Sequence, residues 1–246
     1  EDGQTPESSK LYLYFCSHKD DDDYECYSCL KEDGTYADHF YMSIYEATEV
    51  NGKFRSLSLN RVPTVCISDG LKTCLNLAKQ NGHGWCIDLW SDADLLRCLF
   101  ILITKRLNSR EAIGYGCNRC NYCVTGISNK KGMFWGTASY QDKYGTKYFG
   151  IENFWGHNFH FCAGVLSPDG ETFNVKNTYS IADGTTGIGY NDTGEGYIKT
   201  GIRSSIRGWE TKINGEKGLI TMPVAVDGSS TTYYTDCFYG GRYDGF

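Results

Sequence analysis

Cysteine side chains are the residues of this sequence with the clearest potential for chemistry. Two local clusters occur, Cys26-x-x-Cys29 and Cys117-x-x-Cys120-x-x-Cys123. Cysteine pairs at this spacing can bind zinc. However, the two clusters are far apart in the sequence, and three evenly spaced cysteines do not form a standard zinc knuckle. Zinc binding, disulfide bonds and free thiols therefore all remain open, and free thiols are favoured.

Histidines are the second group that could ligate a metal or transfer a proton. The chain has 5 of them, and only His157 and His160 are close in sequence. The segment around them alternates like a strand, in which residues three apart point to opposite faces. We therefore expect no shared metal and no catalytic histidine. Neither tightly bound copper nor zinc is expected under reducing conditions.

Acidic residues are the third group, and calcium is the ligand they would suit. The run Asp20–Asp23 lacks the alternating spacing of a calcium loop, so a solvated turn is expected. Asp183, Asp192 and Glu195 fall in a loop rich in Gly and Thr. Their spacing is not diagnostic, and a solvated loop is favoured there too. The sequence predicts no cofactor, with calcium as the alternative.

Composition restricts the classes of function. The chain has 246 residues and a net charge of −6, with Lys and Arg scattered, so nucleic-acid binding is not expected. No apolar run is long enough for a membrane span, so membrane insertion is not expected. Tyr (19) and Gly (29) are abundant, as in loop-rich binding surfaces or in β-rich proteins. The start Glu1-Asp2, without Met, indicates a fragment or a processed form.

Two helices are predicted in the first half of the chain. Ser68 is the expected N-cap of the first helix, and Asn81-Gly82 ends it. Ser91 is the expected N-cap of the second. Cys74 and Cys98 are expected to be small buried residues inside these helices. The apolar residues expected to face inward are Leu71, Cys74, Leu75 and Ala78 in the first helix and Leu95, Leu96, Leu99, Ile103 and Leu107 in the second.

Strands are predicted on both sides of these helices. Asn51-Gly52 is a strong signal for a tight hairpin turn. The expected strands are Leu11–Cys16, Phe40–Thr48, Lys53–Leu59, Phe173–Ser180 and the alternating segment Asn158–Cys162. Residues 108–144 and 182–200 are rich in glycine and are expected to be loops.

The aromatic stretch from Tyr148 to Gly164 is predicted to organise the fold. Large aromatic side chains dominate the energetics of protein cores. We therefore expect Trp155, Phe159 and Phe161 to be largely buried. Replacing Phe159 with Ala is predicted to cost about 3–5 kcal/mol, as for other aromatic truncations in cores.

This stretch resembles a known motif. Gly150–Phe161 is similar to the "G-L-x-D-M-x-G-N-V-W-E-W" segment of the formylglycine-generating-enzyme branch of the C-type-lectin-like fold. It is closer to "G-I-E-N-F-W-G-N" in phage tail-fibre and gut-bacterial surface proteins. Three further segments, 40–48, 62–68 and 89–95, resemble other family motifs. The resemblance implies an α+β, C-type-lectin-like fold over residues 38–246, with two helices packed on antiparallel strands and long irregular loops. Residues 1–37 would form an N-terminal strand and acidic turn, which could be a small appendage to this domain.

The C-terminal part departs from the enzymes of that family. They carry an "R-G-G-S-W" segment with an active-site cysteine pair that holds copper. Here the nearest stretch is Tyr239-Gly240-Gly241-Arg242-Tyr243, which has no Trp, and Cys237 is the only cysteine nearby. Cys162 could approach Cys237, but nothing in the sequence shows this. We therefore expect the protein not to be an enzyme.

The end of the chain is the predicted binding face. Some phage and bacterial relatives are targets of diversity-generating retroelements, which vary aromatic and small polar residues on this face of the fold. The alternative is that these tyrosines belong to strands of the core. The candidate ligand-binding residues are Tyr233, Tyr234, Asp236, Tyr239, Arg242, Tyr243 and Asp244. We also expect them to lie on the same side of the domain as the 182–200 loop.

The resulting interpretation is a non-enzymatic module that binds a receptor. The resemblance implies an adhesin-like domain on a virion surface or a cell surface, where it would recognise a host glycan or protein. A homotrimer within a fibre is compatible with this interpretation. The alternatives are a remnant of a formylglycine-generating-type cysteine oxidase and a purely structural domain of a virion.

Overall fold

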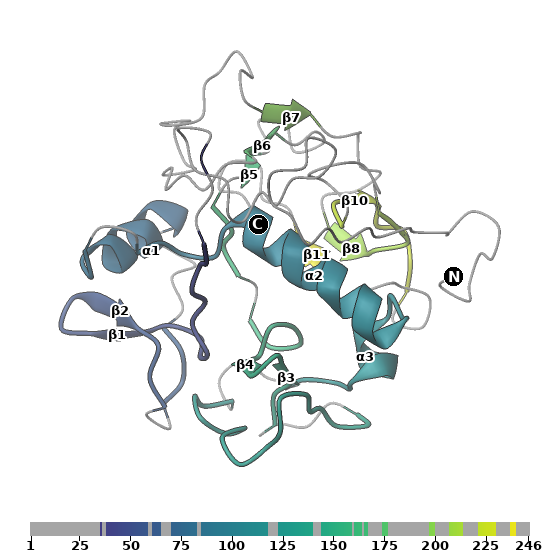
Figure 1. The fold of residues 1–246 in the computed structure, drawn as a ribbon, viewed down its shortest axis with the longest axis horizontal. Helices are drawn as coiled ribbons and strands as arrows, with labels where there is room; N and C mark the ends of the chain where they lie inside the picture. The colour runs from purple at the N-terminus through teal and green to yellow at the C-terminus, as the bar shows by residue number, and fades with distance from the viewer. Residues whose placement is uncertain are drawn as a thin grey trace. The chain divides into compact units, whose positions relative to one another are not determined.

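The structure combines helices with short antiparallel strands, as the α+β class predicts (Figure 1). It is a computed structural model. The residues it describes are 35, 38–58, 61–64, 70–82, 85–117, 123–139, 144–158, 160–163, 165–166, 174–176, 197–199, 207–213, 221–229 and 237–239.

The chain divides into two compact units, each built from separated segments. Unit 1 comprises Glu1–Phe40, Asp88–Leu107 and Cys162–Phe246, and unit 2 comprises Tyr41–Ile87 and Asn108–Phe161. The predicted boundary between residues 37 and 38 falls next to the first of these divisions and stays a prediction.

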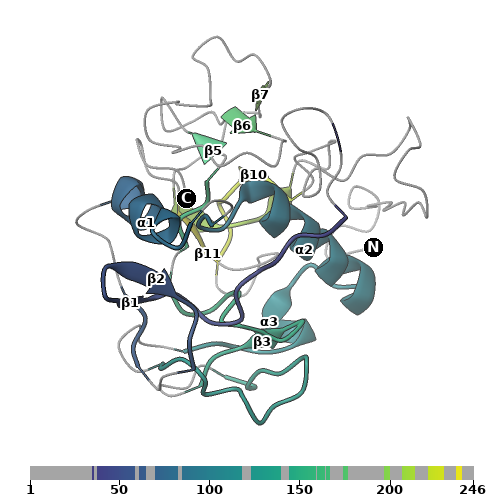
Figure 2. The same cartoon turned by 60° about the vertical axis from the view of Figure 1, so that its left-hand side comes forward.

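The described residues of unit 2 form two hairpins and two helices. The hairpin β1–β2 pairs Thr48 with Arg55, and helix α1 lies beside it in both views (Figures 1 and 2). Asn81, just after α1, donates its side-chain amide to the carbonyl of Phe54 at 2.7 Å. This bond fixes the end of the helix against the hairpin. The elements are β1 (Thr48–Val50), β2 (Lys53–Arg55), α1 (Gly70–Lys79), α3 (Ser109–Ala112), β3 (Lys147–Tyr148) and β4 (Ile151–Glu152).

Unit 1 is built around the longer helix α2. Asp94 in its first turns accepts hydrogen bonds from the backbone N–H and the hydroxyl of Thr221, at 2.8 and 2.6 Å. Strands β5, β6 and β7 form a three-stranded antiparallel sheet, β8 pairs with β11, and β9 pairs with β10. The elements are α2 (Trp90–Thr104), β5 (Val165–Leu166), β6 (Asn174–Lys176), β7 (Tyr197–Lys199), β8 (Arg207–Trp209), β9 (Lys212–Ile213), β10 (Pro223–Ala225) and β11 (Cys237–Tyr239).

Both hairpins of unit 2 turn through two residues with positive φ. Asn51 (φ 55°) and Gly52 (φ 71°) confirm the predicted turn between β1 and β2. Phe149 (φ 48°) and Gly150 (φ 81°) make the same kind of turn between β3 and β4. Positive φ is unusual for a bulky residue such as Phe149. Its ring packs against Tyr148, with the ring centroids 4.7 Å apart.

The helices confirm part of the predicted apolar faces. Cys74, Leu75 and Ala78 of α1 are buried, as is Cys98 of α2. In α2, Leu96 is buried as predicted, and Leu107 is buried just beyond the helix, which ends at Thr104. Ile103, however, is exposed. The N-cap of α2 is Leu89, and Ser91 lies inside the helix. The first turns of α2 also bury the polar residues Ser91, Asp92 and Asp94, so apolar residues alone do not mark the buried side of this helix.

Several predicted strands and loops are different in the structure. Only Thr48 of the expected strand Phe40–Thr48 lies in a strand, and residues 160–162 have no regular secondary structure. Conversely, α3 and β7 lie within stretches expected to be loops. Leu11–Cys16 and the proposed N-cap Ser68 lie outside the described residues. Among the residues described, no helix is long and apolar enough to cross a membrane.

Candidate functional site

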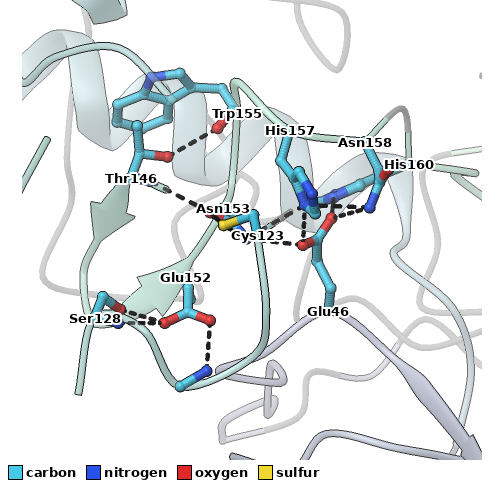
Figure 3. A network of polar contacts seen from close by, with 11 residues as sticks. Glu46, Cys123, Ser128, Thr146, Glu152, Asn153, Trp155, His157, Asn158 and His160 are labelled. Atoms are coloured by element: carbon cyan, nitrogen blue, oxygen red, sulfur yellow. Dashed lines mark hydrogen bonds and ion pairs between the residues drawn. The ribbon is translucent and has the colours of Figure 1, made fainter. Parts of the chain in front are cut away.

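A buried carboxylate, Glu46, is the centre of the most extensive polar network described in unit 2. Two backbone hydrogen bonds position the segment that carries it. Glu152 N donates to Ile44 O at 2.7 Å, and Thr64 N donates to Ala47 O at 2.9 Å. The side chain of Glu46 is 6% exposed. Figure 3 shows it pointing toward the chain between Asn153 and His160.

Four side chains contact the two oxygens of Glu46. Oε2 lies 2.5 Å from His157 Nδ1 and accepts from Asn153 Nδ2 at 2.8 Å. Oε1 accepts from Asn158 Nδ2 at 3.0 Å and lies 3.3 Å from His160 Nε2 (Figure 3). A buried carboxylate requires such partners, because removing a charge from water without them costs far more than one hydrogen bond.

The electrostatics of Glu46 follow from this geometry. Burial on its own raises the pKa of the carboxyl, because a low-dielectric environment disfavours charge. The hydrogen bonds from His157 and His160, together with their charges, outweigh burial and hold the pKa well below its ordinary value. Glu46 is therefore an ionised acceptor at neutral pH.

Asn153 joins this network to the β3–β4 hairpin. Its backbone is left-handed (φ 59°), a conformation that Asn tolerates better than most residues. Its side-chain oxygen accepts from Thr146 N at 3.3 Å, while its amide donates to Glu46 and contacts Cys123 Sγ at 3.5 Å. The residue is 2% exposed, so all these contacts are made out of water.

A second buried carboxylate, Glu152, organises the neighbouring loop. It accepts hydrogen bonds from Gly126 N at 2.8 Å and from the N–H and hydroxyl of Ser128, at 2.8 and 2.5 Å. Lys147 Nζ donates to the carbonyl of the same serine at 3.1 Å. Glu152 thus fixes the loop that follows Cys123, and its oxygens point away from Glu46 (Figure 3).

Two cysteines and a histidine form the candidate metal-binding group among the residues described. The ligand atoms of Cys117, Cys123 and His157 all lie within 4.8 Å of one another. Both cysteines are buried and unbridged. Burial raises the pKa of Cys123 to about 12, and the negative charge of nearby Glu46 acts in the same direction. The Cys123 thiol is therefore protonated at neutral pH in the structure as it stands.

Aromatic rings form a third feature of unit 2. Tyr148 is fully buried, and its ring contacts Phe134, Phe149, Phe154 and Trp155. The cluster reaches the surface at Phe134, which is 43% exposed. Beside it in sequence, the ring of Trp135 contacts that of Tyr144, which is 45% exposed. We call Phe134, Tyr148, Phe149, Phe154 and Trp155 the aromatic cluster, and Trp135 and Tyr144 form a separate pair.

The aromatic residues predicted to be largely buried are not the ones at the centre of the core. Trp155 and Phe161 are only partly buried, and Phe159 lies outside the described residues. Tyr148 occupies the centre instead. The Trp155 indole N–H donates to Gly114 O at 3.1 Å, so this ring lies at a polar boundary of the unit.

The prediction that His157 and His160 point apart was wrong. Residues 156–158 form bends and 160–162 lack regular structure, so the side-chain alternation of a strand does not apply. Both rings contact Glu46. Glu46 itself was not predicted as a site residue. The available signal was its place in the 40–48 segment, one of the segments with the family resemblance.

Most of the predicted binding residues lie outside the described part of the chain. Tyr239 is described as the last residue of β11, where it pairs with Arg207. The expected loop at 182–200 contains β7, and the rest of it is not described. The proposed calcium ligands Asp183, Asp192 and Glu195 and the acidic run Asp20–Asp23 also lie outside the described residues. So do the six other candidate binding residues, Tyr233, Tyr234, Asp236, Arg242, Tyr243 and Asp244.

Comparison with known proteins gives no family for this chain. No protein-family model matches it, and neither do any curated proteins or solved structures. Its function is therefore inferred from its own residues and contacts.

Proposed function

We propose that this chain is a non-enzymatic ligand-binding module that recognises a cell-surface glycan or protein. In this proposal the α+β fold is C-type-lectin-like. The module is displayed outside the cell, on a phage tail fibre or a bacterial surface protein. Where it belongs to a fibre, it forms a homotrimer. The motif between Gly150 and Phe161 supports this part of the proposal.

The exposed side chains of Met133, Phe134 and Tyr144 are the observation that carries the proposal. Single exposed apolar residues are common on protein surfaces, whereas a group of them indicates a binding site. Here Met133 (57% exposed) and Phe134 adjoin in sequence, and Tyr144 contacts Trp135. The buried ring of Tyr148 supports Phe134 from below, at a centroid distance of 5.8 Å. The exposed ring of Phe134 is therefore held in place before any ligand binds.

Exposed aromatic side chains such as Phe134 and Tyr144 suit a glycan or an apolar protein segment. Tyr and Trp combine an apolar ring with a polar tip and lose little conformational entropy on binding. Lys131 adds a charge, with Nζ 4.8 Å from the centroid of the Trp135 ring. Aromatic faces with a few polar groups are typical of ligand sites.

The C-terminal tyrosine-rich segment is a second part of the proposed binding surface. Tyr and Arg are enriched at binding hot spots. Gly240 and Gly241 would allow a sharp turn that presents Tyr239, Arg242 and Tyr243. The support for this part comes from residue types and their order in the sequence.

Binding to glycan arrays and to candidate host cells tests the proposal. We expect Phe134→Ala and Tyr144→Ala each to weaken binding by about tenfold or more, as for other hot-spot aromatics. Tyr41→Ala is the matched control, because Tyr41 is also an exposed aromatic residue (87%) and lies outside residues 133–155. Equal binding by all three variants would contradict the role of this surface. Turnover in a copper-dependent assay of cysteine oxidation would favour the oxidase alternative.

A further inference from the structure

The group formed by Cys117, Cys123 and His157 has the composition of a metal site. Two sulfurs and one imidazole nitrogen, all within 4.8 Å of one another, are soft and borderline ligands of the kind that zinc prefers. Around a tetrahedral zinc with Zn–S near 2.3 Å, such atoms would be roughly 3.5–4 Å apart. Each pair of atoms would have to approach by at most about 1.3 Å to reach this spacing.

The backbone brings these ligands together at a close approach of two glycines. A Cβ added at Gly116 would lie 2.0 Å from the carbonyl oxygen of Gly156. The residues that follow these glycines are Cys117 and His157. A Cβ at Gly145 would lie 1.8 Å from Asn153 Oδ1 and 3.3 Å from Cys123 Sγ. Two positions without a side chain therefore allow the ligand residues to pack closely.

The Glu46 network provides an independent indication of a metal ligand. Metal-binding histidines commonly donate their second ring nitrogen to a carboxylate, which fixes the tautomer and the direction of the ring. His157 Nδ1 contacts Glu46 Oε2, and the His157 side chain is fully buried. In this arrangement Nε2 would be the metal ligand.

We propose that Cys117, Cys123 and His157 bind a zinc ion, with Glu46 as the carboxylate that orients His157. Binding would release the two thiol protons to solvent and leave two thiolate ligands. The ion would connect the segment that carries Cys117 and Cys123 to the segment that carries His157. It would therefore stabilise unit 2. This inference does not depend on the proposed binding function. It is opposite to the expectation from the cysteine spacing alone.

Metal analysis of the whole chain, purified under reducing conditions without chelator, tests the proposal. We expect about one zinc per chain. After the zinc is removed, Co²⁺ added to the same protein should give the visible bands of tetrahedral cobalt and a thiolate-to-cobalt charge-transfer band. The proposal is overturned if neither zinc nor a cobalt spectrum is found, or if mass spectrometry finds a Cys117–Cys123 disulfide in this protein.

Variants locate the metal. Cys117→Ser, Cys123→Ser and His157→Gln should each lose zinc and the cobalt spectrum, while Cys86→Ser, which removes a cysteine outside the site, should keep both. If a ligand variant does not fold, Glu46→Gln serves instead. Its zinc affinity should fall by about 10–100-fold, as for other partners of metal-binding histidines. Unchanged affinity in Glu46→Gln would overturn the assigned role of Glu46, and metal retained by all ligand variants would overturn the site.

Discussion

At the residue scale, Glu46 shows how a buried charge is stabilised by partners distant in sequence. Its carboxylate has four side-chain contacts, all from residues 153–160. Replacing it with Gln removes the charge from these hydrogen bonds. We expect the free energy of unfolding at neutral pH to fall by about 1.5–3 kcal/mol, the usual contribution of hydrogen bonds to charged groups. Urea denaturation of both proteins measures this difference.

The lowered pKa of Glu46 also predicts that the effect of this substitution on stability depends on pH. Because folding lowers the pKa of Glu46, its stabilisation is complete above the unfolded value, near 4.5, and is lost as the pH falls further. The stability difference between the native protein and Glu46→Gln should therefore shrink below that pH. Glu49→Gln, at an exposed position, is the control and should change the free energy of unfolding at neutral pH by less than about 0.5 kcal/mol. A difference that stays constant from neutral to acidic pH would contradict the assignment of a lowered pKa.

At the element scale, close backbone contacts constrain the loops of unit 2. The Cβ of an alanine at position 116 would overlap the carbonyl of Gly156, which is backbone and cannot rotate away. We expect Gly116→Ala to destabilise the protein by about 1–3 kcal/mol, as overpacking usually does. Gly132→Ala is the control, since nothing lies within 4 Å of its Cβ position. Thermal unfolding of both variants makes the comparison.

The end of α2 offers a prediction in the opposite direction. Lys105 caps the helix in the left-handed region (φ 56°), and its N–H donates to Ile101 O. Residues other than glycine pay about 1–2 kcal/mol in this conformation, while glycine loses about 0.5–1 kcal/mol of unfolded-state entropy. Lys105→Gly should therefore stabilise the protein by about 0.5–1 kcal/mol. Lys105→Ala, which keeps a Cβ and loses the charge, should not, and equal gains in both would point to charge instead.

At the scale of the whole molecule, binding and folding should be separable. If Arg242 and Tyr243 belong to a binding face, replacing both with Ala should abolish adhesion to the cognate cell. The free energy of unfolding should change by less than about 1 kcal/mol, as is usual at exposed positions. Cell binding and denaturation measured on the same preparation distinguish the two effects. A double variant that unfolds would place these residues in the core.

The sequence by itself determined the features that depend on neighbouring residues. Asn51-Gly52 specifies a hairpin turn because both residues tolerate positive φ, and the structure confirms that turn. The apolar spacing of α1 likewise predicted the burial of Cys74, Leu75 and Ala78. These signals act over a few residues, so no tertiary information is needed to interpret them.

The tertiary structure alone decided the polar centre of unit 2. Glu46 and His157 are 111 residues apart in the sequence and meet because backbone bonds such as Glu152 N to Ile44 O align their segments. The strand pattern of residues 158–162 suggested that the two histidines diverge. In the structure residues 156–158 form bends and residues 160–162 have no regular secondary structure, and both rings reach one carboxylate. Glu46 lies more than 100 residues from either histidine, so a pattern within one segment could not predict this site.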